Sequence, residues 1–168
     1  MNPLIRSEHA EDIASIRTVH QSAFPGPGEA EVVDALRASG HLTISLVAEV
    51  AGAGIVGHIA FSPVTLETGL QGLGLAPLAV LPEFQRQGIG GKLVRAGITA
   101  CHDAIWPYIV VLGDPEYYQR FGFVTAARWK LLDEYGGGSA FQAIELRPLT
   151  LPAGGGLVRY GEEFALIG

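Results

Sequence analysis

Apolar residues recur at two different spacings along the chain, and these spacings divide it into helices and strands. A spacing of three to four residues predicts a helix from Ala10 to about Phe24 and a second helix at Glu29–Ser39. The run Pro25-Gly26-Pro27-Gly28 separates them, because proline and glycine do not continue a helix. Shorter apolar runs between turn residues predict strands. The predicted strands are Leu4–Arg6, Leu42–Val50, Ile55–Val64, Leu73–Leu81, Tyr108–Leu112 and Phe141–Leu146.

The stretch 75–112 has the pattern strand, helix, strand. We expect its helix at about Gly88–Ala104, and the almost wholly apolar Tyr108–Leu112 is typical of a strand buried on both faces. Strands joined by a helical crossover run parallel, and ligands bind at their carboxyl ends. Pro77 predicts a break in the first strand, because proline has no N–H group for the sheet. The remaining predicted elements are a short helix at 115–121 and an edge hairpin at Gly156–Phe164.

A glycine-rich run opens the predicted crossover helix. It consists of Gln85, Arg86, Gln87, Gly88, Ile89, Gly90, Gly91 and Lys92. The first N–H groups of a helix have no partner inside the helix and carry partial positive charge, so they bind phosphate. Glycines let the backbone approach the ligand, and Arg86, Lys92 and Arg95 add positive charge. The spacing matches neither a P-loop nor the dinucleotide-binding fingerprint. The run therefore predicts a phosphate-binding turn that is neither a P-loop nor a dinucleotide-binding turn.

Two motifs carry a resemblance to a known family. The pattern Gln-x-x-Gly-x-Gly, after a strand ending in Leu-Ala-Val-x-Pro, resembles the acetyl-CoA-binding core of the GNAT (GCN5-related N-acetyltransferase) family. The second motif is Tyr118, four residues before Gly122-Phe123. A closer resemblance is to the YhbS-like predicted N-acetyltransferases, over about residues 3–164. The segments that carry this closer resemblance are GHIAFSPV (57–64), VLGDPEYYQRFGF (111–123) and FQAIEL followed by G-x-V-x-Y.

This resemblance implies a fold, a cosubstrate and a set of site residues. The implied fold is an α/β domain over residues 1–168. Its sheet is mixed and mostly antiparallel, with a central splayed parallel strand pair and helices on both faces. The core is expected at about 3–124, and a strand and hairpin extension at about 125–168. The implied cosubstrate is acetyl-CoA, with no metal. The expected acetyl-CoA-binding residues are Leu78, Ala79, Val80, Gln85, Arg86, Gln87, Gly88, Ile89, Gly90, Gly91 and Lys92.

Transfer of an acetyl group to an amine requires three chemical groups. Free N–H groups near Leu78–Val80 would polarise the thioester carbonyl. A carboxylate would deprotonate the acceptor amine, whose ordinary pKa is ~10.4. A tyrosine would donate a proton to the leaving thiolate, and we expect Tyr118, with Tyr117 as the alternative. Glu29 is the expected base. The other candidates for the base are Glu31, Asp114 and Glu116, whereas His58 is expected to be a strand residue hydrogen-bonded within the sheet.

Composition and charge restrict the remaining possibilities. The chain has 168 residues, 48% of them hydrophobic, yet no apolar run reaches the ~20 residues of a membrane span. One cysteine and an N-terminus unlike a signal peptide favour the cytoplasm, and Cys101 is expected to be a buried helix residue rather than a nucleophile. A net charge of −6 argues against binding to nucleic acid.

The sequence also limits which partners are expected. We expect a small-molecule or peptide amine as acceptor, and its charge to be positive because six acids and three arginines occupy the N-terminal region 6–37. A homodimer is left open. Two alternatives to acetyl transfer are also left open: a non-catalytic acyl-CoA-binding or regulatory module, and a transferase for another acyl group.

Overall fold

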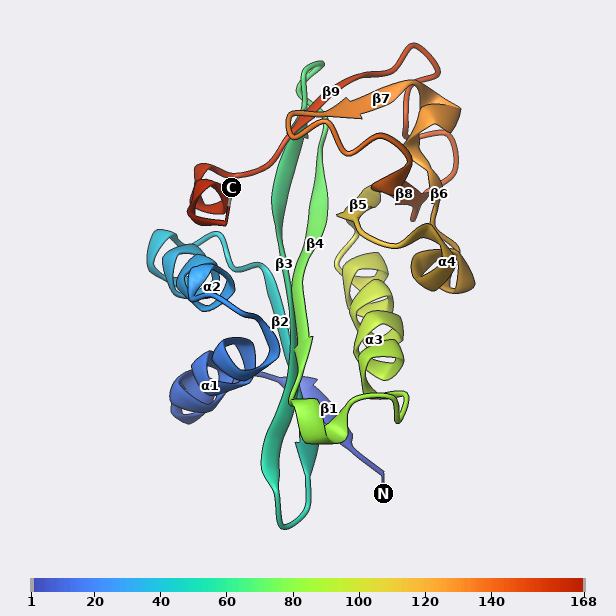
Figure 1. The fold of residues 1–168 in the computed structure, drawn as a ribbon. Helices are drawn as coiled ribbons and strands as arrows, with labels where there is room; N and C mark the ends of the chain where they lie inside the picture. The colour runs from blue at the N-terminus through green and yellow to red at the C-terminus, as the bar shows by residue number, and fades with distance from the viewer. Residues whose placement is uncertain (1, 168) are drawn as a thin grey trace. The chain divides into compact units, whose positions relative to one another are not determined.

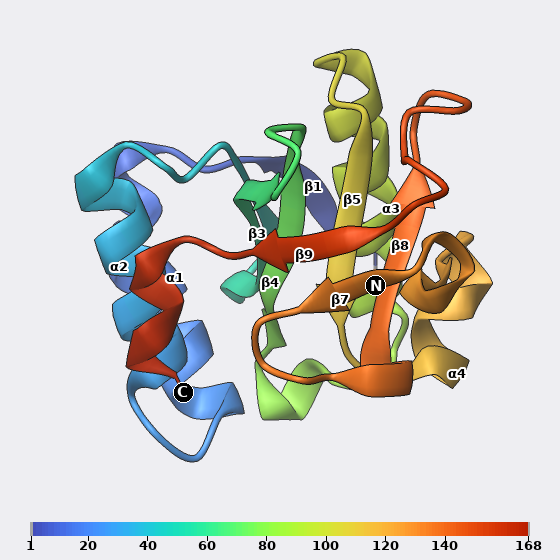
Figure 2. The ribbon, with the colours of Figure 1, turned by 90° about the horizontal axis from the view of Figure 1, so that it is seen from above.

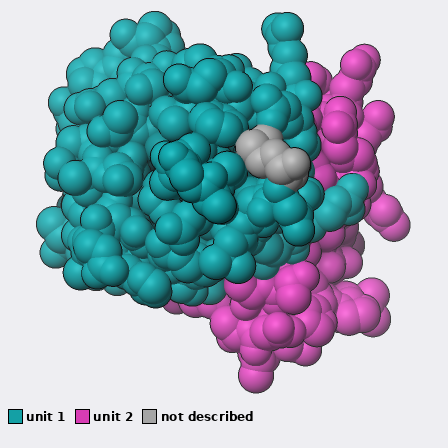
Figure 3. All heavy atoms as spheres, turned by 90° about the horizontal axis from the view of Figure 1, so that it is seen from below, with its two compact units in different colours: residues 1–62, 76–97, 162–168 teal, residues 63–75, 98–161 magenta. Residues whose placement is uncertain are grey.

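The computed structural model describes residues 2–167, which form two compact units (Figure 3). Unit 1 comprises residues 2–62, 76–97 and 162–167, and unit 2 comprises 63–75 and 98–161. Three elements contribute residues to both units, and each unit is described by itself. These elements are β3 (Gly54–Leu66), β4 (Gln71–Val80) and α3 (Ile89–Asp103).

Unit 1 begins with a strand and two amphipathic helices. After β1 (Leu4–Ser7) and a 3-10 turn, η1 (Ala10–Asp12), come α1 (Ile13–Ala23) and α2 (Gly28–Ser39) (Figure 1). Gly40 ends α2 in the left-handed conformation, with a φ of 79°. Both predicted helices are confirmed, although the first opens with the 3-10 turn.

The sheet of unit 1 has α1 and α2 on one side and α3 on the other. Its strand order is β1, β2 (Ile44–Val50), β3 and β4. Antiparallel pairing joins β1 to β2 and β2 to β3. The buried side chains Ile16, Val33 and Val47 join the two helices to β2. On β3, Gly57 lies against α3, since a Cβ built there would be 3.0 Å from Leu93 Cδ1. Strand β2 begins at Ile44 rather than at Leu42, because the Leu42 N–H donates to the Leu36 carbonyl at the end of α2.

Unit 2 contains the parallel strand pair. Strands β3 and β4 meet there in a tight turn, and β5 (Tyr108–Leu112) runs parallel to β4, with Leu73 opposite Ile109 and Gly74 opposite Val110. Strand β5 also pairs antiparallel with β8 (Phe141–Glu145), and β8 with β6 (Val124–Thr125). The sheet is thus mixed and mostly antiparallel, as the sequence predicted. The short helices of this unit are α4 (Pro115–Tyr118), η3 (Gln119–Phe121), η4 (Ala126–Trp129) and η5 (Gly138–Ala140).

The predicted hairpin at Gly156–Phe164 is wrong. Only β9 (Gly156–Arg159) is a strand, and it pairs in parallel with β7 (Leu131–Asp133) and antiparallel with β3 (Figure 2). The Tyr160 N–H donates to the Glu134 side chain instead of continuing a ladder. The next residues form a 3-10 helix in unit 1, η6 (Glu162–Leu166), which packs against α2. Among residues 2–167, no helix combines the length and apolar content needed to cross a membrane.

Candidate active site

The glycine-rich run forms the turn between β4 and α3 in unit 1. A 3-10 turn, η2 (Pro82–Phe84), follows β4. The Gln85 side-chain amide then donates to the Val80 carbonyl at 2.9 Å, which fixes the turn to the end of the strand. Arg86 and Gly88 have left-handed φ angles of 64° and 83°. A turn that contains left-handed residues can point successive backbone N–H groups toward a common anion.

Helix α3 presents free N–H groups at this turn. The Lys92 N–H donates to the Gly88 carbonyl at 3.1 Å, which is the first bond of the helix. The N–H groups of Ile89, Gly90 and Gly91 precede it and have no acceptor within the helix. A Cβ built on Gly88 meets no atom within 4 Å, so the space in front of the turn is open. This geometry fits a diphosphate group.

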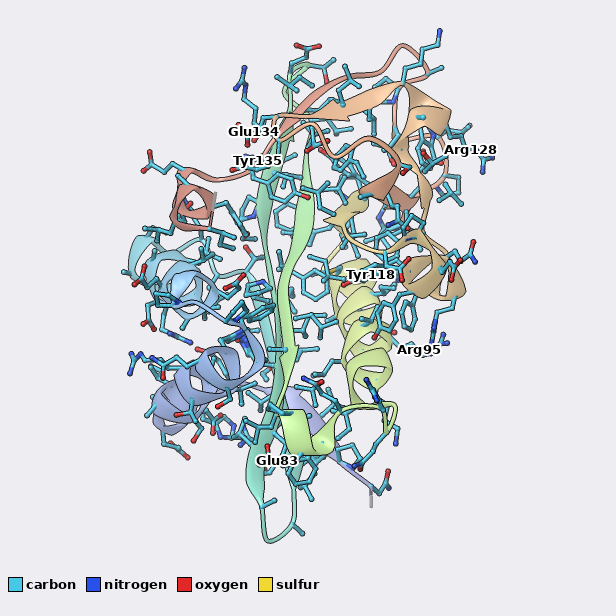
Figure 4. All side chains as sticks on the ribbon, in the orientation of Figure 1. Glu83, Arg95, Tyr118, Arg128, Glu134 and Tyr135 are labelled. Atoms are coloured by element: carbon cyan, nitrogen blue, oxygen red, sulfur yellow. The ribbon has the colours of Figure 1, made fainter. Side chains whose placement is uncertain are left out.

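The side chains around the turn divide into core and surface. The Ile89 side chain is buried and packs into the core, so its backbone N–H is the group that can meet a ligand. Arg86, Lys92 and Arg95 are exposed. Figure 4 shows Arg95 on α3 and Glu83 on η2. The sequence-predicted binding residues 85–92 therefore form one continuous turn within unit 1, in which every residue except Ile89 is at least partly exposed.

The predicted thioester-binding segment is the end of β4. Ala79 and Val80 are buried, and Leu78 is partly exposed. The Ala79 carbonyl oxygen would lie 3.4 Å from a Cβ built on Gly57, which is ordinary van der Waals contact, whereas Leu93 Cδ1 on α3 would lie at only 3.0 Å. Gly57 thus allows β3 to lie close to α3.

Tyr118 lies at the end of α4 in unit 2 (Figure 4). Its ring packs edge-on against Phe123, with centroids 5.7 Å apart, and a Cβ built on Gly113 would be 2.5 Å from the ring. Burial raises the pKa of Tyr118 to about 12, so the hydroxyl keeps its proton at neutral pH. Tyr117 packs against Phe121 instead, beneath the Arg120 guanidinium, and burial also raises its pKa.

The candidate bases are carboxylates in different settings. Glu29 is partly buried in the first turn of α2, and Glu31 is exposed in the same turn, where acids are favoured by the helix dipole. Asp114 accepts a hydrogen bond from the Glu116 N–H at 3.0 Å and therefore caps α4. Asp114 and Glu116 are both exposed.

Two other sequence interpretations concern histidine and cysteine. Cys101 is buried on α3, and burial raises its pKa to about 12, whereas the neighbouring side chains of His102 and Asp103 are exposed. This confirms the buried-residue interpretation. His58 lies on β3 as expected, but its side chain bonds to His20 of α1, which the sequence did not predict. The only feature of the sequence that indicated a buried role for His20 was its position on the apolar stripe of its helix.

Fold and site together define a GNAT-type transferase: a mixed sheet with a parallel strand pair, and a glycine turn that opens the helix between those strands. Residues 41–125 match the family model described as an acetyltransferase (GNAT) domain. The chain belongs to the GNAT family and is an acyl-CoA-dependent N-acetyltransferase, as the sequence predicted.

Relatives support this assignment over nearly the whole chain. The N-acetyltransferase YhbS of Escherichia coli is 39% identical over 163 residues, 96% of this chain and 98% of that protein. Its crystal structure in complex with CoA superimposes with a TM-score of 0.94, at 38% identity, and covers 100% of this chain and 94% of that one. A GNAT acetyltransferase from Brucella melitensis, in complex with acetyl-CoA, gives a TM-score of 0.81 at 39% identity and covers 97% and 98%.

Proposed function

We propose that the protein transfers an acetyl group from acetyl-CoA to a primary amine of a small-molecule or peptide acceptor. The amine attacks the thioester directly, without a covalent enzyme intermediate. The observation that carries this proposal is the turn before α3, with its open face and with N–H groups that have no acceptor within the helix. The E. coli and Brucella relatives, crystallised with CoA and acetyl-CoA, support it.

The diphosphate of acetyl-CoA would bind to the backbone N–H groups of residues 87–91. Helix N-termini bind phosphate because several unpaired donors and the helix dipole act together. Exposed Arg86 and Lys92 would add long-range attraction for the anion. The Gln85 side chain would act indirectly, because its amide holds the turn on β4.

Residues 78–80 would hold the thioester. Backbone N–H groups there would stabilise the negative charge that develops on the carbonyl oxygen during attack. Tyr118 would donate a hydrogen bond to the departing sulfur. A phenol with a pKa of about 12 is a weaker acid than a thiol with a pKa of ~8.5, so Tyr118 would pass on a proton from the amine nitrogen rather than lose its own. Glu29 remains the candidate carboxylate on the acceptor side.

A ligand-binding experiment tests the first step. CoA should raise the Tm of the wild-type protein, and Gly90→Val should abolish that rise by placing a branched side chain at the free N–H groups. Gly88→Asn is a second variant, because asparagine tolerates the left-handed conformation that this position requires. Gly154→Val is the matched control, since a Cβ built there meets nothing within 4 Å. Unchanged CoA stabilisation in both turn variants would reject this site.

A screen of amines with CoA release as the readout tests the second step. Acetylation of a primary amine supports the proposal. CoA stabilisation without CoA release from any amine would favour a non-catalytic binding module. Release from a longer acyl-CoA, but not from acetyl-CoA, would indicate a transferase for another acyl group.

A further inference from the structure

A chain of hydrogen-bonded side chains crosses the interior of unit 1. His20 Nε2 on α1 lies 2.8 Å from His58 Nδ1 on β3, and both side chains are fully buried. His58 Nε2 lies 2.8 Å from the Ser45 hydroxyl of β2. That hydroxyl bonds to Glu8 Oε1 at 2.5 Å. Arg37 of α2 holds both oxygens of Glu8, at 2.9 and 3.1 Å, and the Glu8 side chain is 19% exposed. This series of hydrogen-bonded side chains thus leads from the core of unit 1 to its surface.

The carboxylate end fixes the direction of every hydrogen bond. Glu8, paired with Arg37, can only accept, so the Ser45 hydroxyl donates to it. The Ser45 oxygen then accepts from His58 Nε2–H. A neutral imidazole has one N–H group, so His58 Nδ1 accepts from His20 Nε2–H. His20 Nδ1 is consequently left with a lone pair.

Both imidazoles are neutral at physiological pH. Burial lowers the pKa of His20 to about 4, against a smaller opposing effect of Asp34 on α2. Burial also lowers the pKa of His58, and the positive charge of Arg37, together with that of His20 when His20 is protonated, lowers it further. The facing carboxylate of Glu8 lies 4.0 Å from His58 Nε2. Neutral rings are what a chain of alternating donors and acceptors requires.

The inner end of this chain of hydrogen bonds is the His20 imidazole, and within residues 2–167 it has no further partner. His20 Nδ1 is buried and has no hydrogen-bond partner among the described residues. A buried polar atom without a partner costs about 1–3 kcal/mol, so this end of the hydrogen-bonded chain lowers the stability of the fold unless a ligand or water binds there. The Phe24 ring stacks on the imidazole, with centroids 6.1 Å apart, and begins the segment that leads to Pro27. Phe24 is partly exposed, so its ring is the group that an acceptor would have to displace to reach Nδ1.

Strand β3, which carries His58, lies beside the end of β4. Gly57, the residue before His58, lies next to the Ala79 carbonyl, and the Leu81 N–H donates to the Val56 carbonyl at 2.8 Å. His58 is therefore on the strand adjacent to the segment to which the proposed function assigns the thioester.

We propose that His20, His58, Ser45 and Glu8 form a proton relay that deprotonates the acceptor ammonium. This inference rests on the proposed acetyl transfer. His20 Nδ1 takes one proton from the ammonium, its Nε2 proton moves to His58 Nδ1, the His58 Nε2 proton moves to Ser45, and the Ser45 proton moves to Glu8 and then to solvent. The neutral amine forms the N–C bond, and the C–S bond breaks. The sulfur takes a second proton from the nitrogen, so each turnover releases one proton.

The first test needs no acceptor. Two-bond ¹H–¹⁵N correlation spectra of the wild-type protein report which nitrogen of each imidazole carries the proton. Both His20 and His58 should be Nε2–H tautomers between about pH 6 and pH 8. Assignments would come from His20→Gln and His58→Gln, with His102→Gln as a surface control. A proton on His20 Nδ1 in the resting protein would overturn the relay.

The second test compares Ser45→Ala with Ser45→Thr, which break and keep the hydroxyl at the middle of the chain. The probes are butylamine, which is protonated at pH 8, and hydroxylamine, which is neutral there. With butylamine, Ser45→Ala should lower kcat about 10²-fold or more and Ser45→Thr should restore it, because general-base catalysis contributes about 10²–10⁴-fold. With hydroxylamine, both variants should match the wild type.

The outcomes separate this inference from the proposed function. The proposed function is supported if CoA no longer stabilises Gly90→Val and the wild type acetylates either amine. These two results do not depend on the relay. Equal rates of Ser45→Ala and Ser45→Thr with butylamine would overturn the relay alone, and loss of activity in Glu29→Gln would then identify Glu29 as the base. If the wild type acetylates neither probe, the relay is tested by the imidazole tautomers alone: a proton on His20 Nδ1 would overturn it.

Discussion

Replacing Tyr118 by phenylalanine removes one hydroxyl group and keeps the ring. The ring accounts for the contacts of this side chain: its centroid lies 5.0 Å from that of Tyr117, 5.7 Å from Phe123 and 6.4 Å from Phe121, and it fills the space beside Gly113. All these contacts persist in Tyr118→Phe. We therefore expect its free energy of unfolding to change by less than about 1 kcal/mol, and its Tm and CoA stabilisation to match those of the wild type.

The expected effect is on turnover. A proton donor positioned at a leaving group contributes about 10²–10⁴-fold, which corresponds to about 3–5 kcal/mol of transition-state stabilisation at ~1.4 kcal/mol per tenfold change. Because burial raises the pKa of Tyr118 to about 12, the hydroxyl remains protonated throughout the usual assay range. The wild-type enzyme should therefore show no loss of kcat from Tyr118 ionisation below about pH 10.

The assay is CoA release at saturating acetyl-CoA, with an amine that the screen identifies. Tyr117→Phe is the matched control, since its ring lies next to that of Tyr118 and packs against Phe121. The expected result is a low kcat with an unchanged KM for acetyl-CoA in Tyr118→Phe, and normal kinetics in Tyr117→Phe. Full turnover by Tyr118→Phe refutes its role. A loss confined to Tyr117→Phe would assign the role to that residue.

Two further predictions concern charge in unit 1. Arg6 holds the pKa of Asp12 at about 2, against an ordinary 3.8, so Asp12→Asn should cost about 2 kcal/mol of unfolding free energy above about pH 4. The difference from the wild type should vanish as the pH falls through 2, measured by denaturant titration, and a constant difference would contradict it. Glu29→Gln with Glu31→Gln should lower kcat/KM for cationic amines at low salt but not for neutral ones, and an equal effect on both would exclude electrostatic steering.

The elements of this fold were predictable where their causes are local. The helical spacing of apolar residues predicted α1 and α2, and the apolar run at 108–112 predicted β5. The glycine-rich turn at the start of a helix predicted the candidate phosphate site. The pairing of β9 with β7 was not predictable, because the register depends on residues far apart in sequence. The start of β2 was also missed, because Leu42 bonds to the end of α2 rather than to the sheet. In both cases a partner from elsewhere in the chain overrides the local pattern.

The pairing of His20 with His58 was not predictable for the same reason, because the two residues are far apart in the sequence. Each histidine alone has an ordinary interpretation, one as part of an apolar helix stripe and the other as a strand residue. Their significance arises from the hydrogen-bond direction that Glu8 imposes through Ser45, which a sequence pattern does not contain. Two apolar side chains of similar volume would fill the same space without the cost of an unpaired nitrogen. Natural proteins commonly retain such costs where function requires them. The unpaired Nδ1 of His20, like the unpaired Ser62 Oγ and Glu163 Oε1 of unit 1, is therefore an observation that packing alone does not explain.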